Sequence, residues 1–193
     1  MATRLRIRRK NALNILKEAD KLRSFDDFPV LRDEVDPQLH VSRNETDQPF
    51  WLESEKDTVL AQVSGRSQVA FRDGPVRYFD LTPGEFVYVP GGSTHRILTA
   101  EPGVVLRYKA RLTGEEAVRW FCRGCDTPLF SHRHDGEGPV QASYADAIDL
   151  FNDDEGRRAC PVCQTVHPPV DISLFRFRQV ADVIAAGDDD DDD

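Results

Sequence analysis

The stretch Gly84-Glu85-Phe86-Val87-Tyr88-Val89-Pro90-Gly91-Gly92-Ser93-Thr94-His95 decides the fold of this chain. A short apolar segment runs into a Pro-Gly-Gly corner, and a histidine follows where a new strand would begin. On both sides of this corner, from Leu39 to Tyr108, short apolar segments alternate with Gly- and Pro-containing turns. Regularly spaced short strands of this kind are typical of an all-β barrel or sandwich.

The composition is that of a water-soluble globular chain and excludes two classes of function. The 193 residues carry a net charge of −9, of which Asp188–Asp193 contribute six, so the remainder carries −3 (−9 + 6). This balance has no electrostatic signature of nucleic-acid binding. No apolar run is long enough for a membrane span or a secretory signal. We therefore expect a cytoplasmic protein with a disordered acidic tail.

Outside the barrel, the sequence predicts three helical segments. Residues 11–23 place Leu13, Leu16, Ala19 and Leu22 on one face, which predicts a docking helix. Residues 114–120 are predicted as a short helix that ends the barrel, and residues 172–186 as an amphipathic segment that packs against it. The resulting organisation is an N-terminal helical arm (1–36), a barrel (37–115), an appendage with the amphipathic segment (116–187) and the acidic tail (188–193).

All four cysteines fall in two Cys-x-x-Cys pairs, Cys122/Cys125 and Cys160/Cys163, which 34 residues separate. Two such pairs complete a tetrahedral site of four thiolates that suits zinc or iron. The alternatives are disulfides or a redox-active pair, but neither a secretory pattern nor a βαβ unit accompanies them. Four thiolates leave no open coordination position, so the predicted role of the metal is structural.

These motifs together resemble the bacterial type of 3-hydroxyanthranilate 3,4-dioxygenase. The resemblance rests on Gly84–His95, on Trp120-Phe121-Cys122-x-x-Cys125 and on residues 158–168, and it spans roughly residues 37 to 170. It implies a cupin double-stranded β-helix barrel with a rubredoxin-like metal knuckle, and a homodimer. Members of the family open the ring of 3-hydroxyanthranilate with O2 at a non-heme Fe(II), which a two-histidine-one-carboxylate triad holds.

The chain departs from the family at the positions that carry this chemistry. Leu52 and Thr58 stand where the resemblance places the first histidine and the glutamate, so only His95 of the triad remains. Gln48 and Thr99 replace the two substrate arginines, and no acid lies near Tyr108, where the family has a glutamate. A catalytic Fe(II) is therefore not expected at the family position. A relocated metal site would use His95, His40 and Asp57.

Without the iron, the candidate pocket consists of polar and aromatic residues, namely His95, Gln62, Thr58 and Trp51. Such a lining predicts either a site for a small neutral or aromatic molecule or a filled barrel core. Three functions stay open: a non-dioxygenase binding, scaffold or partner protein; an oxidoreductase that acts on a related aromatic with relocated ligands or altered cupin chemistry; and an interaction module whose cysteine knuckle contacts a partner.

Overall fold

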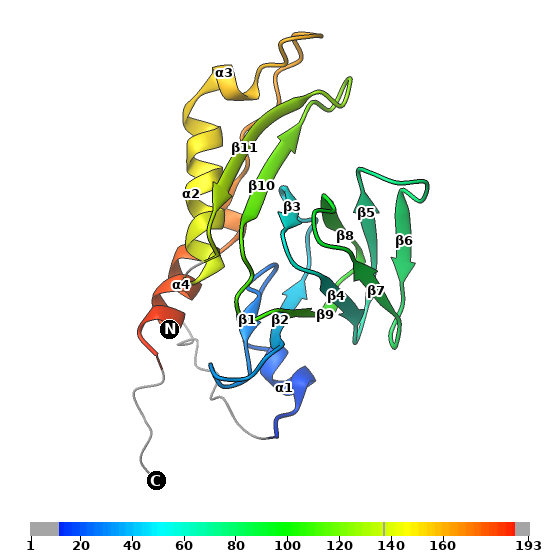
Figure 1. Ribbon diagram of the computed structural model, residues 1–193, viewed down its shortest axis with the longest axis vertical. Coiled ribbons are helices and arrows are strands. Elements are labelled where there is room, and N and C mark those ends of the chain that lie inside the picture. Colours follow the sequence, from blue (N-terminus) through cyan, green and yellow to red (C-terminus); the bar gives the residue numbers. More distant parts are fainter. Residues whose placement is uncertain (1–11, 137, 188–193) are drawn as a thin grey trace.

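The computed structural model describes residues 12–136 and 138–187, and two antiparallel sheets form its centre (Figure 1). The acidic tail and the first eleven residues of the predicted arm lie outside the described residues. One sheet has the strand order β1 (Phe28–Pro29), β2 (Gln38–Asn44), β9 (Gly103–Lys109), β4 (Thr58–Gln62), β7 (Phe86–Val89). The other has the order β11 (Pro128–His134), β10 (Glu116–Phe121), β3 (Trp51–Ser54), β8 (His95–Glu101), β5 (Arg66–Phe71), β6 (Tyr78–Leu81).

The order of strands β2 to β9 identifies the architecture. These eight strands divide into two sets with the orders β2-β9-β4-β7 and β3-β8-β5-β6. Strand β2 therefore pairs with β9, β3 pairs with β8, and β4 pairs with β7. Two facing four-stranded sheets with this connectivity form a jelly roll, the architecture of cupins. The predicted mainly β, cupin-type barrel is therefore confirmed.

The corner quoted above forms because its glycines occupy places that a side chain cannot. Gly84 has a φ of 92° and donates its N–H to the carbonyl of Gln62 at 2.9 Å, which begins β7. A Cβ on Gly91 would lie 2.3 Å from the carbonyl oxygen of Glu55. This close approach lets the chain turn against the neighbouring strand, and His95 then enters β8 fully buried.

Strand β9 is buried on both faces, which explains why the barrel has two apolar clusters. Val105 points into the barrel and belongs to its core cluster. Val104 and Leu106 point the other way and pack under the N-terminal arm with Ala19 and Leu22. The arm therefore docks through Ala19 and Leu22 of the predicted face, with Leu13 partly buried beside them, whereas Leu16 of that face is 52% exposed.

The helix in this arm is shorter than predicted. Helix α1 covers only Ile15–Ala19, with the Asn14 side chain accepting the Lys17 N–H at its start. Beyond Asp20 the backbone hydrogen bonds run from residue i to residue i−3, as in a 3-10 turn. The Asp26 carboxylate then accepts the Arg23 N–H. The local carboxylate thus competes with continuation of the helix.

The predicted short helix at residues 114–120 is wrong, because this segment is strand β10. It pairs with β3 on one side, where Trp51 lies opposite Arg119, and with β11 on the other. The barrel sheet therefore extends through β3 into β10, which begins at Glu116, the residue where the sequence predicted the start of the appendage. Its last inward residue, Trp120, stacks on Phe151 with ring centroids 4.3 Å apart.

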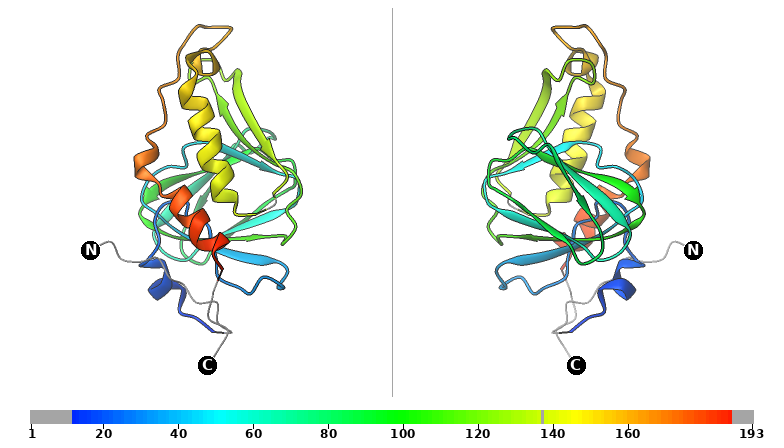
Figure 2. Two further views of the ribbon diagram at one scale, coloured as in Figure 1. Left: turned by 90° about the vertical axis from the view of Figure 1, so that its left-hand side faces the viewer. Right: turned by 90° about the vertical axis from the view of Figure 1, so that its right-hand side faces the viewer.

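The segment between the two cysteine pairs, predicted to be rich in loops, contains a fourteen-residue helix. This helix, α2 (Val140–Asp153), is followed by α3 (Glu155–Arg158), a 3-10 turn (Ile172–Leu174) and α4 (Phe177–Ala185). Figure 2 shows α2 and α4 along the same side of the barrel, where they pack against each other. Helix α4 buries Phe177 and Val180, as its amphipathic pattern predicted. No helix within residues 12–136 and 138–187 is both long and apolar enough to cross a membrane.

Candidate metal centre and barrel interior

The four cysteines converge at one point, as their spacing predicted. Their ligand atoms all lie within 4.8 Å of one another, and none of the four forms a disulfide. The Sγ atoms of Cys122 and Cys163 are 3.3 Å apart, and those of Cys125 and Cys160 are 3.5 Å apart. A tetrahedral metal with bonds of about 2.3 Å to sulfur places its thiolates about 3.8 Å apart. The cluster therefore has the size of a four-thiolate metal centre.

The two Cys-x-x-Cys pairs are built by the same local structure. In each, the first cysteine donates its N–H to the threonine five residues later, Thr127 or Thr165, at 2.8 and 3.0 Å. The residue after the second cysteine, Asp126 or Gln164, has a φ near 60° and donates its N–H to the backbone carbonyl of the first cysteine. This repeated turn aims both sulfurs of a pair to one side. The sequence shows it as Cys-x-x-Cys-Asp-Thr and Cys-x-x-Cys-Gln-Thr.

Inside the barrel, an arginine lies where a metal bound to His95 would lie. Arg107 Nη1 is 3.3 Å from His95 Nε2, while His95 Nδ1 is 3.1 Å from the carbonyl oxygen of Ser93. A carbonyl only accepts, so Nδ1 carries the proton and Nε2 presents its lone pair to the guanidinium. Burial, and then the charge of Arg107, lower the pKa of His95 to about 3. The imidazole is therefore neutral, with both ring nitrogens engaged.

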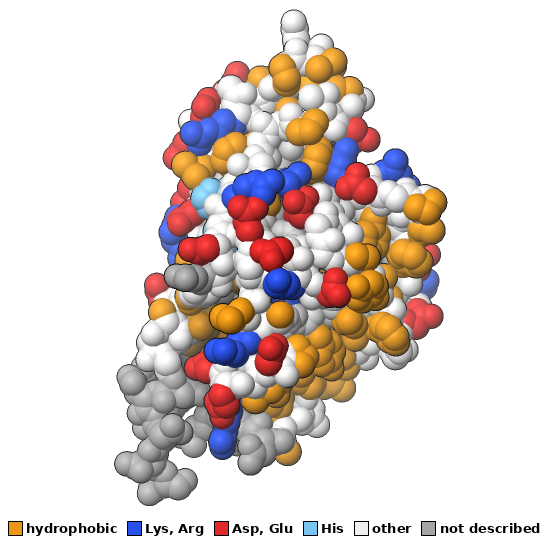
Figure 3. Space-filling model, viewed as in Figure 1, with side chains coloured by type: hydrophobic (Ala, Val, Ile, Leu, Met, Phe, Trp, Pro, Cys, Tyr) orange, Lys and Arg blue, Asp and Glu red, His pale blue; other side chains and the backbone are white. Residues whose placement is uncertain are grey.

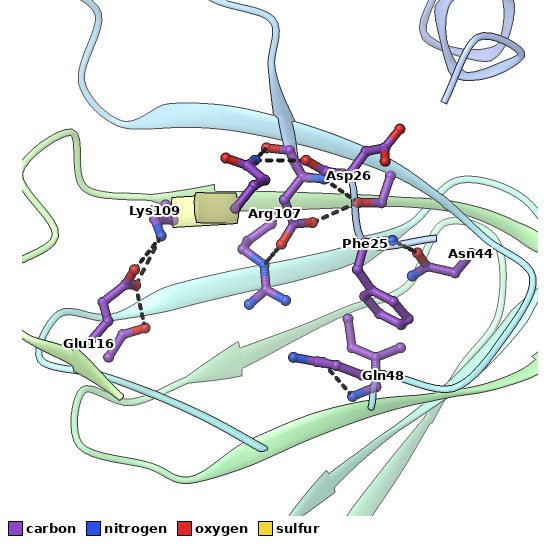
Figure 4. Close-up of polar contacts among 12 residues, drawn as sticks. Phe25, Asp26, Asn44, Gln48, Arg107, Lys109 and Glu116 are labelled. Carbon is purple, nitrogen blue, oxygen red and sulfur yellow. Dashed lines mark hydrogen bonds and ion pairs between the residues drawn. The ribbon is translucent and has the colours of Figure 1, made fainter. Parts of the chain in front are cut away.

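Arg107 is held by a second buried group from the N-terminal arm. Its Nε lies 3.2 Å from a carboxylate oxygen of Asp27, and the two side chains are 4% and 8% exposed. The Ser42 hydroxyl donates to Asp27 at 2.7 Å, and the Gln141 amide donates to the backbone carbonyl of the same residue at 2.9 Å. Figure 4 shows the Arg107 side chain projecting between the sheets. Elements distant in sequence thus fix the guanidinium in place.

A second ion pair lies at one end of the barrel, between β9 and β10 (Figure 4). Lys109 Nζ lies 2.9 and 3.0 Å from the two carboxylate oxygens of Glu116, and the Ser54 hydroxyl donates to the same carboxylate at 2.7 Å. Burial alone would raise the pKa of Glu116, but the charge and hydrogen bonds of Lys109 and the Ser54 bond outweigh it and hold the pKa at about 2. Both partners are therefore charged at neutral pH.

The candidate pocket residues do not all share this interior. Thr58 and Gln62 are buried on the inward face of β4, and Gln62 accepts a hydrogen bond from Ser67 at 2.6 Å. Trp51 is on the opposite face of β3 from the buried Leu52, and the guanidinium of Arg96 lies over its ring. The predicted uncharged lining is also wrong, because Asp27, Arg107, Lys109 and Glu116 carry charges inside the barrel.

The structure does not bring the relocated metal ligands together. Asp57 is exposed and accepts the Gly91 N–H at 2.9 Å, at the corner outside the barrel. His95 is fully buried and His40 is partly buried, and desolvation lowers the pKa of each to about 3. Among the described residues, the four cysteines are the group of three or more histidine, cysteine, aspartate or glutamate side chains close enough to hold a metal.

A cavity of about 330 Å³ opens beside His40 and Lys109, between the barrel end and helices α2 and α4. Gln38 and Gln141 also line it, and each uses its amide nitrogen on two backbone carbonyls. This fixes the orientation of both amides, and their Oε1 atoms make no hydrogen bond with the described residues. His40 Nδ1 is likewise without a partner there. The cavity is thus lined by three residues whose polar atoms are buried and have no hydrogen-bond partner in the described part of the chain.

The comparisons with known proteins find distantly similar solved structures and assign no activity to the chain. No protein-family model and no curated protein matches the chain. A structure of hydroquinone 1,2-dioxygenase PnpCD in complex with Cd2+ and 4-hydroxybenzonitrile is 21% identical, with a TM-score of 0.43 over 49% of this chain and 69% of that one. A cupin-2 domain containing protein from Shewanella frigidimarina is 19% identical, with a TM-score of 0.45 over 51% and 93%. A protein from Neisseria meningitidis is 23% identical, with a TM-score of 0.44 over 51% and 98%. Similarities this distant assign no activity to the chain.

Proposed function

We propose that this chain is a diverged cupin whose barrel binds a small molecule without a catalytic iron, and whose four cysteines hold a structural metal. The single observation that supports the first part is the contact between Arg107 and His95. Nε2 is the atom through which a barrel histidine would bind Fe(II), and here a permanent cation lies 3.3 Å from it. A guanidinium stays protonated at any physiological pH, so it repels a metal cation at that atom.

The neighbouring carboxylates do not compensate for this repulsion. Asp27 is paired with Arg107, and Glu116 is paired with Lys109, so each carboxylate already faces a cation. Leu52 and Thr58, at the two other triad positions, offer no adequate ligand for Fe(II). A ring-cleaving dioxygenase needs a metal with open positions, and the barrel residues give little support for one.

The cavity beside His40 and Lys109 is the proposed binding site. Its unpaired amide oxygens, on Gln38 and Gln141, accept hydrogen bonds, so the ligand they suit carries hydroxyl or N–H donors. Apolar side chains, among them Val140 and Ile184, line part of the cavity, and the polar side chains of Asp33, Arg111 and Thr113 line another part. Catechol and resorcinol, two small neutral aromatics with two hydroxyl donors each, are suitable first probes.

Metal analysis tests the proposal directly. We expect about one zinc or iron per chain in the wild type and in His95→Ala, and loss of that metal in Cys160→Ser. With added Fe(II) and 3-hydroxyanthranilate, we expect no oxygen consumption above that of the buffer. A second metal that His95→Ala removes, or turnover of the substrate, would contradict the proposal and favour the dioxygenase with relocated ligands.

A binding measurement tests the cavity. We expect catechol or resorcinol to raise the melting temperature of the wild type, and Gln141→Leu to abolish that rise because it removes one acceptor. Gln68→Leu is the matched control, since Gln68 lies on β5 and bonds Asp80 at the surface. Equal responses from the two variants would remove the support for this cavity.

A further inference from the structure

A second cavity, outside the barrel interior, gathers three arginines. It has a volume of about 360 Å³ and lies between the outer face of the β3–β8–β5 sheet and the loop that carries Cys122. We call it the arginine cleft. Figure 3 shows the molecule hollowed between the end that holds the cysteines and the lobe of β5 and β6, with Lys and Arg side chains on both sides. The residues that matter to the argument are Trp51, Arg72, Arg96, Phe121, Arg123 and His167.

Arg96 has an unusual environment for a cation. It lies on β8 beside the Trp51 ring, with its guanidinium carbon 5.4 Å from the ring centroid. Its side chain forms no hydrogen bond or ion pair with any residue that the structure describes. Burial lowers the pKa of Arg96, and the charge of Asp47 acts in the opposite direction. A partly desolvated guanidinium with free donors is costly, and an anion in the cleft would offset that cost.

The other two arginines are positioned by neighbours that leave donors free. Arg72 lies 3.7 Å above the Phe121 ring and donates to the backbone carbonyl of Asp126 at 3.1 Å. Arg123 donates its Nε–H to His167 Nε2 at 3.2 Å, and His167 Nδ1 is 2.6 Å from the Pro168 carbonyl. The terminal nitrogens of Arg123 have no partner in the described chain. Stacking and a ring hydrogen bond thus hold these guanidiniums in orientation. Of the two, Arg72 also faces a carboxylate oxygen of Asp126 at 3.4 Å.

The acids in the cleft do not balance this charge. Asp47 and Asp126 also line it, which leaves one more arginine than acids. Asp47 accepts the Thr99 N–H at 2.8 Å, and the Asp126 side chain is 80% exposed, where water screens its ion pair with Arg72. The local charge is therefore positive, although the chain as a whole is acidic.

We propose that the arginine cleft binds the phosphate group of a small molecule. Guanidinium forks match the oxygens of a phosphate through paired hydrogen bonds, and converging arginines favour a dianion over a monoanion. The aromatic wall of Trp51 and Phe121 suits a phosphate ester with an apolar part. The arginine cleft lies outside the barrel interior, so this proposal does not depend on the iron-free function proposed above, and each can be tested without the other.

Calorimetric titration of the metal-loaded protein with inorganic phosphate and phenyl phosphate tests this site, with benzoate as a singly charged comparison. We expect both phosphates to bind, phenyl phosphate the more tightly, and benzoate at least tenfold more weakly than phenyl phosphate. Arg96→Gln and Arg123→Gln should each weaken phosphate binding at least tenfold. Arg66→Gln is the control, because Arg66 lies on β5, is exposed and faces Glu101 outside the cleft.

Unchanged circular dichroism and melting temperature without phosphate would establish that the variants fold. Because Arg123 is exposed, its variant keeps the test valid if Arg96→Gln fails to fold. No heat of binding at millimolar phosphate would overturn the proposal. So would an equal loss of affinity in Arg66→Gln, or binding of a single-stranded oligonucleotide together with no binding of phosphate or phenyl phosphate.

Discussion

Lys109 on β9 and Glu116 on β10 form a buried ion pair that connects the two sheets of the barrel. Their side chains are 7% and 3% exposed, and Nζ lies within 3.0 Å of both carboxylate oxygens. A charge this deeply buried is tolerated only with a partner. The barrel therefore contains a polar tie between its sheets at a place where apolar side chains usually meet.

Removing one partner of this tie should cost far more than removing both. We expect Glu116→Gln to lower the free energy of unfolding by about 3–5 kcal/mol, because it leaves the Lys109 charge unpaired. The double variant Lys109→Met/Glu116→Leu should recover most of that loss. Urea denaturation of Lys109→Met, Glu116→Leu and the double variant measures the coupling. Additive losses would mean that the two charges are not paired in solution.

Stability should fall as the pH drops below neutral, because the fold desolvates His40 and His95 and so favours their neutral form. Each has a pKa of about 3 in the folded chain against 6.5 for an ordinary histidine. The unfolded chain therefore binds more protons between these values, and the stabilisation is complete only above about pH 6.5. Each histidine should contribute about 2 kcal/mol of the decrease from pH 7 to pH 5.

Chemical denaturation at pH 7, 6 and 5 measures how the free energy of unfolding depends on pH. These values lie above the pH range in which Glu116 titrates. His95→Gln should have a shallower slope than the wild type, whatever its absolute stability. His132→Gln, at a partly exposed position on β11, is the comparison. The same slope in His95→Gln and the wild type would show that His95 is protonated already in the folded state.

Loss of the metal should loosen the end of the molecule where the cysteines meet. We expect a strong chelator to lower the melting temperature of the wild type by roughly 10 °C or more, because metal binding supplies folding energy to a loop-built site. Cys160→Ser should have this lower melting temperature without the chelator, and adding the chelator should not lower it further. Scanning calorimetry measures both. A chelator effect of the same size in Cys160→Ser would place the metal elsewhere.

The corner before His95 should not accept a methyl group at Gly91. The Cβ of Gly91→Ala would lie 2.3 Å from a backbone carbonyl oxygen that cannot move freely, so we expect a loss of about 1–3 kcal/mol. Gly92→Ala is the matched comparison: its Cβ meets no atom within 4 Å, and only its φ of 77° is unfavourable. That variant should lose about 1 kcal/mol. Urea denaturation that ranks the two in the opposite order would contradict the close approach.

The sequence predicted the features that local pattern determines. The corner at Gly84–His95 predicts the barrel, and the spacing of the cysteines predicts their cluster. The charged interior was missed, because the partners of Arg107 and Lys109 come from the arm and from β10 and meet only in the folded chain. Their place on the inward face of β9 could be read from the alternation with Val105, but sequence reasoning assigns such charges to solvent.

Two errors have different causes. The segment of strand β10 predicts a helix because Gly114-Glu115-Glu116-Ala117 favours one locally, whereas pairing with β3 and β11 overrides that propensity. Helix α2 did leave a signal. Val140, Tyr144, Ile148 and Phe151 recur at helical spacing and are all buried.

Strand β10 also limits how this protein can be divided. It begins with Glu116, which completes the barrel ion pair, and ends at Phe121, next to Cys122 of the four-cysteine cluster. A cut or a recombination joint at residue 115 would leave Lys109 unpaired on one product and remove a sheet strand from the barrel. The cysteine-bearing segment is therefore poorly suited to exchange between proteins as a separate cassette, and the two parts are best inherited, expressed and engineered as one unit.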